Sequence, residues 1–313
     1  MSIIEKSRKI EEIVLQNTGR RGVQDLYQAL VELTGGSPTL RSATSLHKAI
    51  MGHGNVIIAS GFTIASVGKC ETDGLIGSIV LAEFLNKIGC HVIFTTDPQN
   101  QIVFEKVGRA AHLNSFECVG FPIEHDSAKK EAVRSFKDLA PTALVAIERP
   151  GWNRKMIYHN MRGEDISSKT AKIDHMFNMA RSSKILTIAV GDGGNEIGMG
   201  NILEAVMKSI PFGSICQCPC RGGIACITKV DHLVVSSVSN WGAYALVALT
   251  ALLAKTPFRH TASLEKKLIE SAIQAGAVDG VSGRPIPFVD GQSIAISSDV
   301  VERISKMLSE QTS

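Results

Sequence analysis

Residues 55–95 have the sequence NVIIASGFTIASVGKCETDGLIGSIVLAEFLNKIGCHVIFT, in which two short apolar runs flank a helical pattern. The runs Asn55–Ala59 and His91–Thr95 are typical of buried strands, and Asp73–Ile88 repeats apolar residues at helical spacing. Two strands joined by a helix form a βαβ unit, whose strands are parallel and whose crossover is right-handed. This stretch therefore predicts an α/β fold.

The same alternation continues toward the C-terminus. Further strands are predicted at residues 116–119, 142–147, 185–190 and 232–236, and helices at 99–107, 128–139, 168–181, 202–209, 241–255, 264–275 and 300–308. We therefore predict a three-layer α/β fold, with a mostly parallel, Rossmann-like sheet and helices on both faces. Amphipathic patterns near the start predict an N-terminal helical extension over residues 1–40, followed by a single α/β domain over residues 41–313.

Composition narrows the classes of partner. The 313 residues are 44% hydrophobic and 20% charged, which is typical of a folded soluble protein. A net charge of +3 is too small to indicate nucleic acid or an anionic membrane as a partner. The start of the chain lacks a signal-peptide pattern, and seven cysteines in such a chain indicate reduced thiols. We expect a cytoplasmic homo-oligomer.

Residues 191–201, GDGGNEIGMGN, hold five glycines directly after a predicted strand. A glycine-rich turn between a strand and a helix lets backbone N–H groups approach a ligand. Here the turn also carries Asp192, Asn195 and Glu196, and two carboxylates would repel a phosphate. The combination indicates metal binding, proton transfer or capture of an ammonium group. The glycine spacing differs from the dinucleotide fingerprint, so neither a nicotinamide nor a flavin cofactor is expected.

Polar residues also follow other predicted strands, where open parallel sheets bind ligands. Glu71, Thr72 and Asp73 precede a helix, Glu148 and Arg149 follow the strand 142–147, and Asn240 follows the strand 232–236. Structural interpretations stand beside the functional ones. Thr72 and Asp73 can cap the following helix, and Glu148 with Arg149 can form an ion pair.

Two loops are rich in functional groups. The loop 158–165, YHNMRGED, has the composition of an active-site element or of a solvated surface loop, and Arg162 in it can clamp a carboxylate. Cys216, Cys218 and Cys220 have a spacing that differs from that of zinc knuckles. This spacing favours free thiols over a bound soft metal.

Several of these motifs together resemble a known family. They are ETDG at 71–74, ERPG at 148–151, NMRG at 160–163 with DIS at 165–167, the whole run 191–201, SNWG at 239–242 and VDGV at 278–281. The chain resembles the D-glutamate cyclase C-terminal domain family, formerly a domain of unknown function, and in particular its stand-alone prokaryotic members. The resemblance runs from about residue 20 to the C-terminus.

The resemblance implies a carbon–oxygen lyase that cyclises D-glutamate, or a related amino acid, to 5-oxo-D-proline with loss of water. Because mitochondrial members carry a second, hydro-lyase-like half, it also implies a possible separate hydro-lyase-like partner. Asp192 or Glu196 would be the base, with Glu148 beside them, and Arg149 and Arg162 would hold the substrate carboxylates. N–H groups of the turn 193–195 would stabilise the oxyanion. The remaining substrate-binding candidates are Gly193, Gly194, Asn195, Asn160, Asn240 and Thr72.

A divalent cation, Mg²⁺ or Mn²⁺, is expected at Glu71, Asp73 or Asp165, where it would polarise the γ-carboxylate. Two other classes of function remain open. One is an enzyme acting on a phosphorylated or nucleotide-like ligand at the glycine turn. The other is a non-catalytic module that binds an amino acid or docks on a partner subunit.

Overall fold

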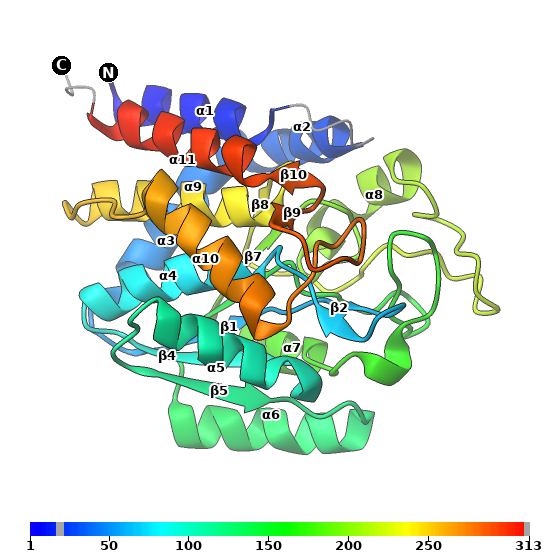
Figure 1. The fold of residues 1–313 in the computed structure, drawn as a ribbon. Helices are drawn as coiled ribbons and strands as arrows, with labels where there is room; N and C mark the ends of the chain where they lie inside the picture. The colour runs from blue at the N-terminus through cyan, green and yellow to red at the C-terminus, as the bar shows by residue number, and fades with distance from the viewer. Residues whose placement is uncertain (17–21, 310–313) are drawn as a thin grey trace.

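The main sheet of the protein has Rossmann topology. The computed structural model describes residues 1–16 and 22–309. Within these residues, six strands pair in parallel in the order β5-β4-β1-β6-β7-β8, which in chain order is 3-2-1-4-5-6 (Figure 1). The strands are β1 (Asn55–Ala59), β4 (His91–Thr96), β5 (Phe116–Gly120), β6 (Ala143–Ile147), β7 (Leu186–Gly191) and β8 (His232–Val235).

Apolar side chains on both faces of this sheet are buried under helices. In β6, for example, Val145 and Ile147 belong to one core cluster, and Leu144 and Ala146 belong to the other. The first face packs against α3 (Pro38–Ile50), α4 (Leu75–Lys87), α5 (Gln101–Ala110) and α9 (Ser239–Leu253). The second packs against α2 (Val23–Thr34), α6 (His125–Leu139), α7 (Asp174–Ser182) and α8 (Leu203–Ser209). The predicted three-layer α/β fold is confirmed.

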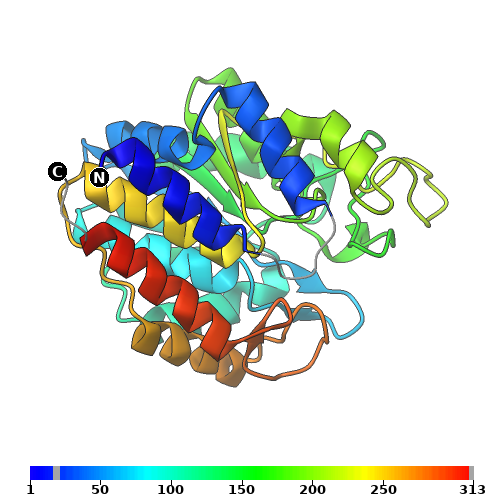
Figure 2. The same cartoon turned by 90° about the horizontal axis from the view of Figure 1, so that it is seen from above.

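Further helices thicken the first of these layers. Helices α1 (Ile3–Val14) and α11 (Ile294–Ser309) lie side by side over α9, and α10 (Ala262–Ala275) packs against α11 and α5 (Figures 1 and 2). The predicted N-terminal extension therefore contributes to both layers, because α1 joins the first and α2 the second. Its predicted boundary at residue 40 falls within α3, and residues 17–21 and 310–313 of the predicted regions lie outside the described residues.

Some element boundaries differ from the sequence prediction. The helix predicted from residue 168 begins at Asp174, after the short 3-10 helix η2 (Ser167–Lys169). The intervening N–H groups have partners elsewhere, since Ala171 donates to Asp97 and Lys172 donates to the carbonyl of Pro122. Short 3-10 helices also precede two helices, η1 (Pro98–Asn100) and η3 (Met199–Ile202), while α11 begins six residues earlier than predicted.

Two small antiparallel hairpins add to the carboxyl edge of the sheet, and the sequence analysis predicted neither. They pair β2 (Thr63–Ile64) with β3 (Lys69–Cys70), and β9 (Phe288–Val289) with β10 (Gln292–Ser293). The turn Asp290-Gly291 between β9 and β10 has positive φ at both residues, as a tight two-residue hairpin requires.

The topology places a crevice between β1 and β6. Connections leave these two neighbouring strands in opposite directions, and ligands of open α/β sheets bind at such a switch point. Among the described residues, no helix has both the length and the apolar composition needed to cross a bilayer.

Candidate active site

An acidic pocket of about 260 Å³ opens at this crevice. Among the described residues that line it, five are acidic and Arg162 is the sole cation. The lining residues come from the loops after β1, β6 and β7, from the loop 160–164 and from the segment 280–290, and they are Phe62, Ile64, Ala65, Ser66, Glu71, Glu148, Asn160, Met161, Arg162, Glu164, Asp192, Gly280, Val281, Ser282, Gly283 and Asp290. This composition favours ligands with a positively charged group.

Three carboxylates converge at the pocket, and two of them, Glu148 and Asp192, line it. Asp73 precedes α4, Glu148 follows β6 and Asp192 follows β7, and one oxygen atom of each lies within 4.8 Å of the others. All three side chains are buried. Three buried carboxyl groups this close to one another cannot all be ionised unless a cation lies among them. Without a cation, at least one of them keeps its proton. The sequence had placed the metal site at Glu71, Asp73 or Asp165, and the structure groups Asp73 with Glu148 and Asp192 instead.

Glu148 keeps a proton more readily than an ordinary carboxyl group. Burial raises the pKa of Glu148 well above its usual value, and the charges of Asp192, Glu196, Asp73 and Glu71 raise the pKa further. The hydroxyl of Ser239 donates a 2.6 Å hydrogen bond to its Oε2. Glu148 also has a φ of 47°, an uncommon backbone conformation for a residue other than glycine. An outlier of this kind is frequent at functional sites.

Asp73 is held in place by the N-terminus of α9. Its two carboxylate oxygens accept the N–H groups of Ser239 and Asn240 at 3.0 and 2.7 Å, and Oδ1 also accepts the N–H of Gly74. Gly74 has a φ of 72°, and a Cβ atom there would lie 2.6 Å from the Cβ of Glu148. The motif Glu71–Gly74 therefore needs its glycine so that two acids can approach each other.

The glycine turn holds the carboxylate of its own Glu196. The N–H groups of Gly193 and Gly194 each donate to Glu196 at 2.6 Å, and that of Asp192 donates at 3.2 Å. This corrects two expectations. Two of the three N–H groups predicted to stabilise an oxyanion, those of Gly193 and Gly194, already have an acceptor. Glu196 is a structural anchor of the turn instead of a base that lines the pocket. From this turn, Asp192 alone lines the pocket.

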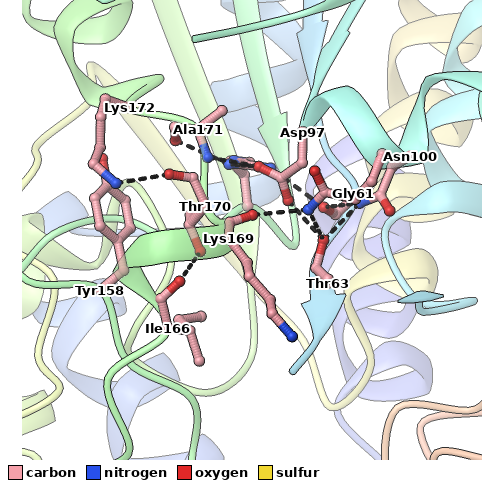
Figure 3. A network of polar contacts seen from close by, with 12 residues as sticks. Gly61, Thr63, Asp97, Asn100, Tyr158, Ile166, Lys169, Thr170, Ala171 and Lys172 are labelled. Atoms are coloured by element: carbon pink, nitrogen blue, oxygen red, sulfur yellow. Dashed lines mark hydrogen bonds and ion pairs between the residues drawn. The ribbon is translucent and has the colours of Figure 1, made fainter. Parts of the chain in front are cut away.

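Arg149 is fully buried and does not reach the pocket. Its Nη2 forms a 2.6 Å ion pair with Asp97 and donates to the carbonyl of Ala171, and its Nη1 donates to the carbonyl of Gly61. Figure 3 shows Asp97 between Ala171 on one side and Thr63 with Asn100 on the other. The expectation that Arg149 holds a substrate carboxylate is therefore corrected, because its guanidinium connects loops of the protein. The alternative of an ion pair between Glu148 and Arg149 is also wrong, because Arg149 pairs with Asp97 and the carboxylate of Glu148 accepts from Ser239.

The loop 160–164 forms one wall of the pocket, as the loop composition predicted. The side-chain oxygen of Asn160 accepts the N–H groups of Arg162 and Glu164, and its Nδ2 donates to the carboxylate of Glu164. Asn160 thus shapes the wall on which Arg162 stands. Asp165 does not join the acidic cluster, since it is exposed and accepts the N–H of Ser167.

Three predicted substrate-binding residues have structural partners instead. Thr72 donates through its hydroxyl to the carbonyl of Phe288, and Asn240 bridges the N–H of Gly77 and the carbonyl of Thr72. Asn195 donates to the carbonyl of His159. None of the three is among the residues that line the pocket. Through these hydrogen bonds, Thr72, Asn195 and Asn240 hold the loops around the pocket in place.

Sequence reasoning missed Asp290 and did not single out Glu164 as a site residue, although both line the pocket. Asp290 lies at the tip of the β9–β10 hairpin, about a hundred residues after the glycine turn. The only signal in the sequence was the Asp290-Gly291 pair, which is typical of a hairpin turn. That signal predicts a turn but not its position beside Glu71 and Asp192.

Comparisons with known proteins agree with the resemblance in the motifs. A family model described as D-glutamate cyclase-like, C-terminal matches residues 10–305. The mitochondrial D-glutamate cyclase of Homo sapiens is 31% identical over 264 residues, which are 81% of this chain and 40% of that protein. The chain thus spans less than half the length of this curated relative.

Proposed function

The chain belongs to the D-glutamate cyclase-like, C-terminal family, and from that membership we propose that it cyclises D-glutamate, or a closely related amino acid, to 5-oxo-D-proline with loss of water. The observation that carries the proposal is the pocket, in which acids surround a single arginine. An amino acid with one ammonium group and a free carboxylate is complementary to this distribution of charge. A phosphorylated ligand is not, because it would meet five acidic side chains.

Substrate orientation follows from the position of the two kinds of charge. Arg162 on the pocket wall binds the α-carboxylate through its guanidinium. The α-ammonium then faces Asp192 and Glu148, two acids that lie close together in the lining of the pocket. Bound in this way, the amine and the γ-carboxyl carbon are brought together within one molecule, which removes much of the entropic cost of ring closure.

Two acids with different protonation divide the proton transfers. Asp192 accepts a proton from the α-ammonium, so that the neutral amine can attack the γ-carboxyl carbon. Glu148, whose burial keeps it protonated, donates to the oxygen that leaves. The C–N bond forms and a C–O bond breaks. The nitrogen loses two protons, the first to Asp192 and the second to the Glu148 carboxylate left after its donation. The departing oxygen gains two protons as water, one from Glu148 and one from the protonated Asp192, so both acids return to their starting states.

A divalent cation fits the same cluster. Asp73, Glu148 and Asp192 offer oxygen atoms within 4.8 Å of one another, and hard cations such as Mg²⁺ and Mn²⁺ prefer oxygen ligands. A cation held there would polarise the γ-carboxylate and neutralise the repulsion among the acids. Glu148 would then ligate in its ionised form and could not donate a proton, so a bound cation and a protonated Glu148 are alternative ways to activate the γ-carboxylate.

The test is an NMR time course of the purified chain with D-glutamate and, separately, L-glutamate, with chelator or with Mg²⁺ or Mn²⁺. We expect 5-oxoproline to appear from D-glutamate. Product from L-glutamate alone would correct the stereochemistry. Broadened substrate signals without any product would contradict catalysis by this chain and favour an amino-acid-binding module or the need for a hydro-lyase-like partner.

A thermal-shift screen distinguishes the proposed function from the remaining alternative, an enzyme that acts on a phosphorylated or nucleotide-like ligand. D-glutamate should raise the melting temperature, because a ligand that binds the folded state alone stabilises it. Nucleotides and sugar phosphates should leave the melting temperature unchanged, with or without Mg²⁺. A shift with a nucleotide and none with D-glutamate would replace the proposal with a phosphate-ligand enzyme.

A further inference from the structure

Three cysteines and a histidine meet outside the pocket. Cys216, Cys218 and Cys220 come from the loop between α8 and β8, and His159 comes from the loop after β6. One potential ligand atom from each lies within 4.8 Å of the others. All seven cysteines of the chain fall within the described residues and are free thiols.

We propose that Cys216, Cys218, Cys220 and His159 bind one zinc ion as a closed structural site. The sulfur of Cys216 lies 3.5 Å from that of Cys218 and 3.3 Å from that of Cys220. The Nε2 atom of His159 lies 3.2 Å from the sulfur of Cys218 and 3.5 Å from that of Cys220. Zinc bond lengths in a tetrahedron give sulfur–sulfur separations of about 3.8 Å and nitrogen–sulfur separations of about 3.6 Å. In these four pairs the atoms need to move apart by only a few tenths of an ångström, and the other two separations are below 4.8 Å.

The chemistry of the four donors selects the metal. Three thiolates and an imidazole are soft to borderline ligands, which suit zinc and exclude Mg²⁺ and Ca²⁺. His159, Cys216 and Cys218 are buried, so solvent has little access to the centre. Four protein ligands leave no open position for a substrate, which is the pattern of a structural zinc site.

Neighbouring groups donate hydrogen bonds to one of the sulfurs. The N–H of Gly222 points at the sulfur of Cys220 from 3.3 Å, and the side-chain amide of Asn153 does so from 3.6 Å. Donors aimed at a sulfur stabilise a thiolate and orient it for a metal, and such outer partners are a regular part of metal sites.

The site joins two loops that form the surroundings of the pocket. Besides the four ligands, the carbonyl of Gly163 accepts the N–H groups of Gln217 and Cys218. His159 directly precedes Asn160, whose side chain holds the wall that carries Arg162. Zinc would therefore fix the loop after β6 to the loop after α8, and removal of zinc should loosen that wall.

The experiment measures metal in the full chain, purified with a reductant and without chelator. After saturation with Zn²⁺ and desalting, we expect one zinc ion per chain by elemental analysis. Replacement by Co²⁺ should give strong thiolate-to-cobalt charge-transfer absorption, which arises only from cysteine ligands. A strong chelator should remove the metal and lower the melting temperature by several degrees.

Matched variants locate the metal. Cys218→Ser should lose the zinc, whereas Cys118→Ser, a cysteine on β5 outside the cluster, should keep it. The double variant Glu148→Gln with Asp192→Asn should also keep it, which excludes the acidic cluster as its site. If Cys218→Ser does not fold, the cobalt spectrum of the unmodified chain decides alone. Failure of the reduced chain to retain zinc, or a cobalt form without the thiolate band, would overturn the proposal.

Discussion

At the scale of single residues, Glu148 makes stability depend on pH. Burial among other carboxylates raises its pKa in the folded protein, whereas in the unfolded chain it ionises near 4.5. Above that pH the unfolded chain has released a proton that the folded protein still holds. Stability therefore falls as pH rises toward the folded-state pKa, by at most about 1.4 kcal/mol per pH unit.

We expect Glu148→Gln to remove this fall, because glutamine accepts the Ser239 hydrogen bond but cannot ionise. The measurement is the free energy of unfolding in urea at a series of pH values with chelator present. The variant should gain stability over the unmodified chain as pH rises. Glu302→Gln, an exposed change on α11, should leave the profile unchanged. Parallel profiles for Glu148→Gln and the unmodified chain would mean that Glu148 ionises normally.

Asp192 is the residue on which turnover should depend most. With the proposed proton acceptor gone, Asp192→Asn should lower the rate of 5-oxoproline formation by about 10²–10⁴-fold. Asp126→Asn makes the same chemical change in an exposed pair with Lys129 on α6 and should leave the rate intact. Rates from the NMR assay within a few-fold of each other would remove Asp192 from the proton-transfer step.

At the scale of elements, the N-terminus of α9 depends on a carboxylate from another part of the chain. Asp73→Ala removes the acceptor for the N–H groups of Ser239 and Asn240 and should cost about 0.5–2 kcal/mol of stability. Thr261→Ala removes the cap of α10 and should cost a similar amount. Only Asp73→Ala should also reduce turnover. Equal turnover in the two variants, measured beside their urea unfolding curves, would leave Asp73 with a capping role alone.

The glycine turn contains a position that no other residue should fill well. Gly194 has a φ of 100°, and an added Cβ atom would lie 2.6 Å from a methyl group of Val206 in α8. Gly194→Ala should therefore destabilise the protein by about 1–3 kcal/mol. Gly36→Ala, where an added Cβ meets nothing within 4 Å, serves as the control and should change stability by less than about 1 kcal/mol. Equal midpoints of urea unfolding for Gly194→Ala and the unmodified chain would show that the glycine turn can shift to accommodate the added methyl group.

The elements that sequence predicted best are those whose own residues determine them. Strands such as β1 and β7 are short apolar runs between polar turns, and α10 ends at Ala275, the last residue of the predicted helix. The predicted start of α7 was wrong because the N–H groups of Ala171 and Lys172, just before the helix, donate to Asp97 and to the carbonyl of Pro122. Both acceptors lie far away in the sequence. Periodicity reports the burial of a segment, but it carries no information on distant partners of its backbone.

At the scale of the whole molecule, Arg149 connects the two halves of the sheet. It follows β6, and its partners Asp97 and Gly61 follow β4 and β1 across the switch point. Arg149→Met would leave Asp97 buried without its cation and should cost about 3–5 kcal/mol. The double variant Arg149→Met with Asp97→Asn should cost clearly less than the sum of the single changes. Additive free energies of unfolding in this double-mutant cycle would rule out coupling across the crevice.

The separation along the sequence between interacting residues explains which parts of the site could be predicted. Asp192, Glu148, Glu71, Asn160 and Arg162 were found because they follow strands or lie in a polar loop, and all of them line the pocket. The role of Arg149 was missed because its partner Asp97 lies 52 residues away. The convergence of His159 on the cysteines was missed because 59 residues separate it from Cys218. Residue types indicate possible chemistry, and the fold decides which of them meet.

The carboxylate of Glu196 has a consequence for inhibitor chemistry. It occupies the N–H groups that, in a strand–turn–helix of this type, would otherwise take up a phosphate, so the chain supplies its own anion there. At this turn, a phosphonate designed to mimic the tetrahedral intermediate of the proposed reaction would compete with the Glu196 carboxylate, which is part of the same chain and therefore has a high local concentration. Compounds that carry an amidine, a guanidine or a second amine meet the acidic lining of the pocket instead. Inhibitor design for this protein therefore begins with cationic groups.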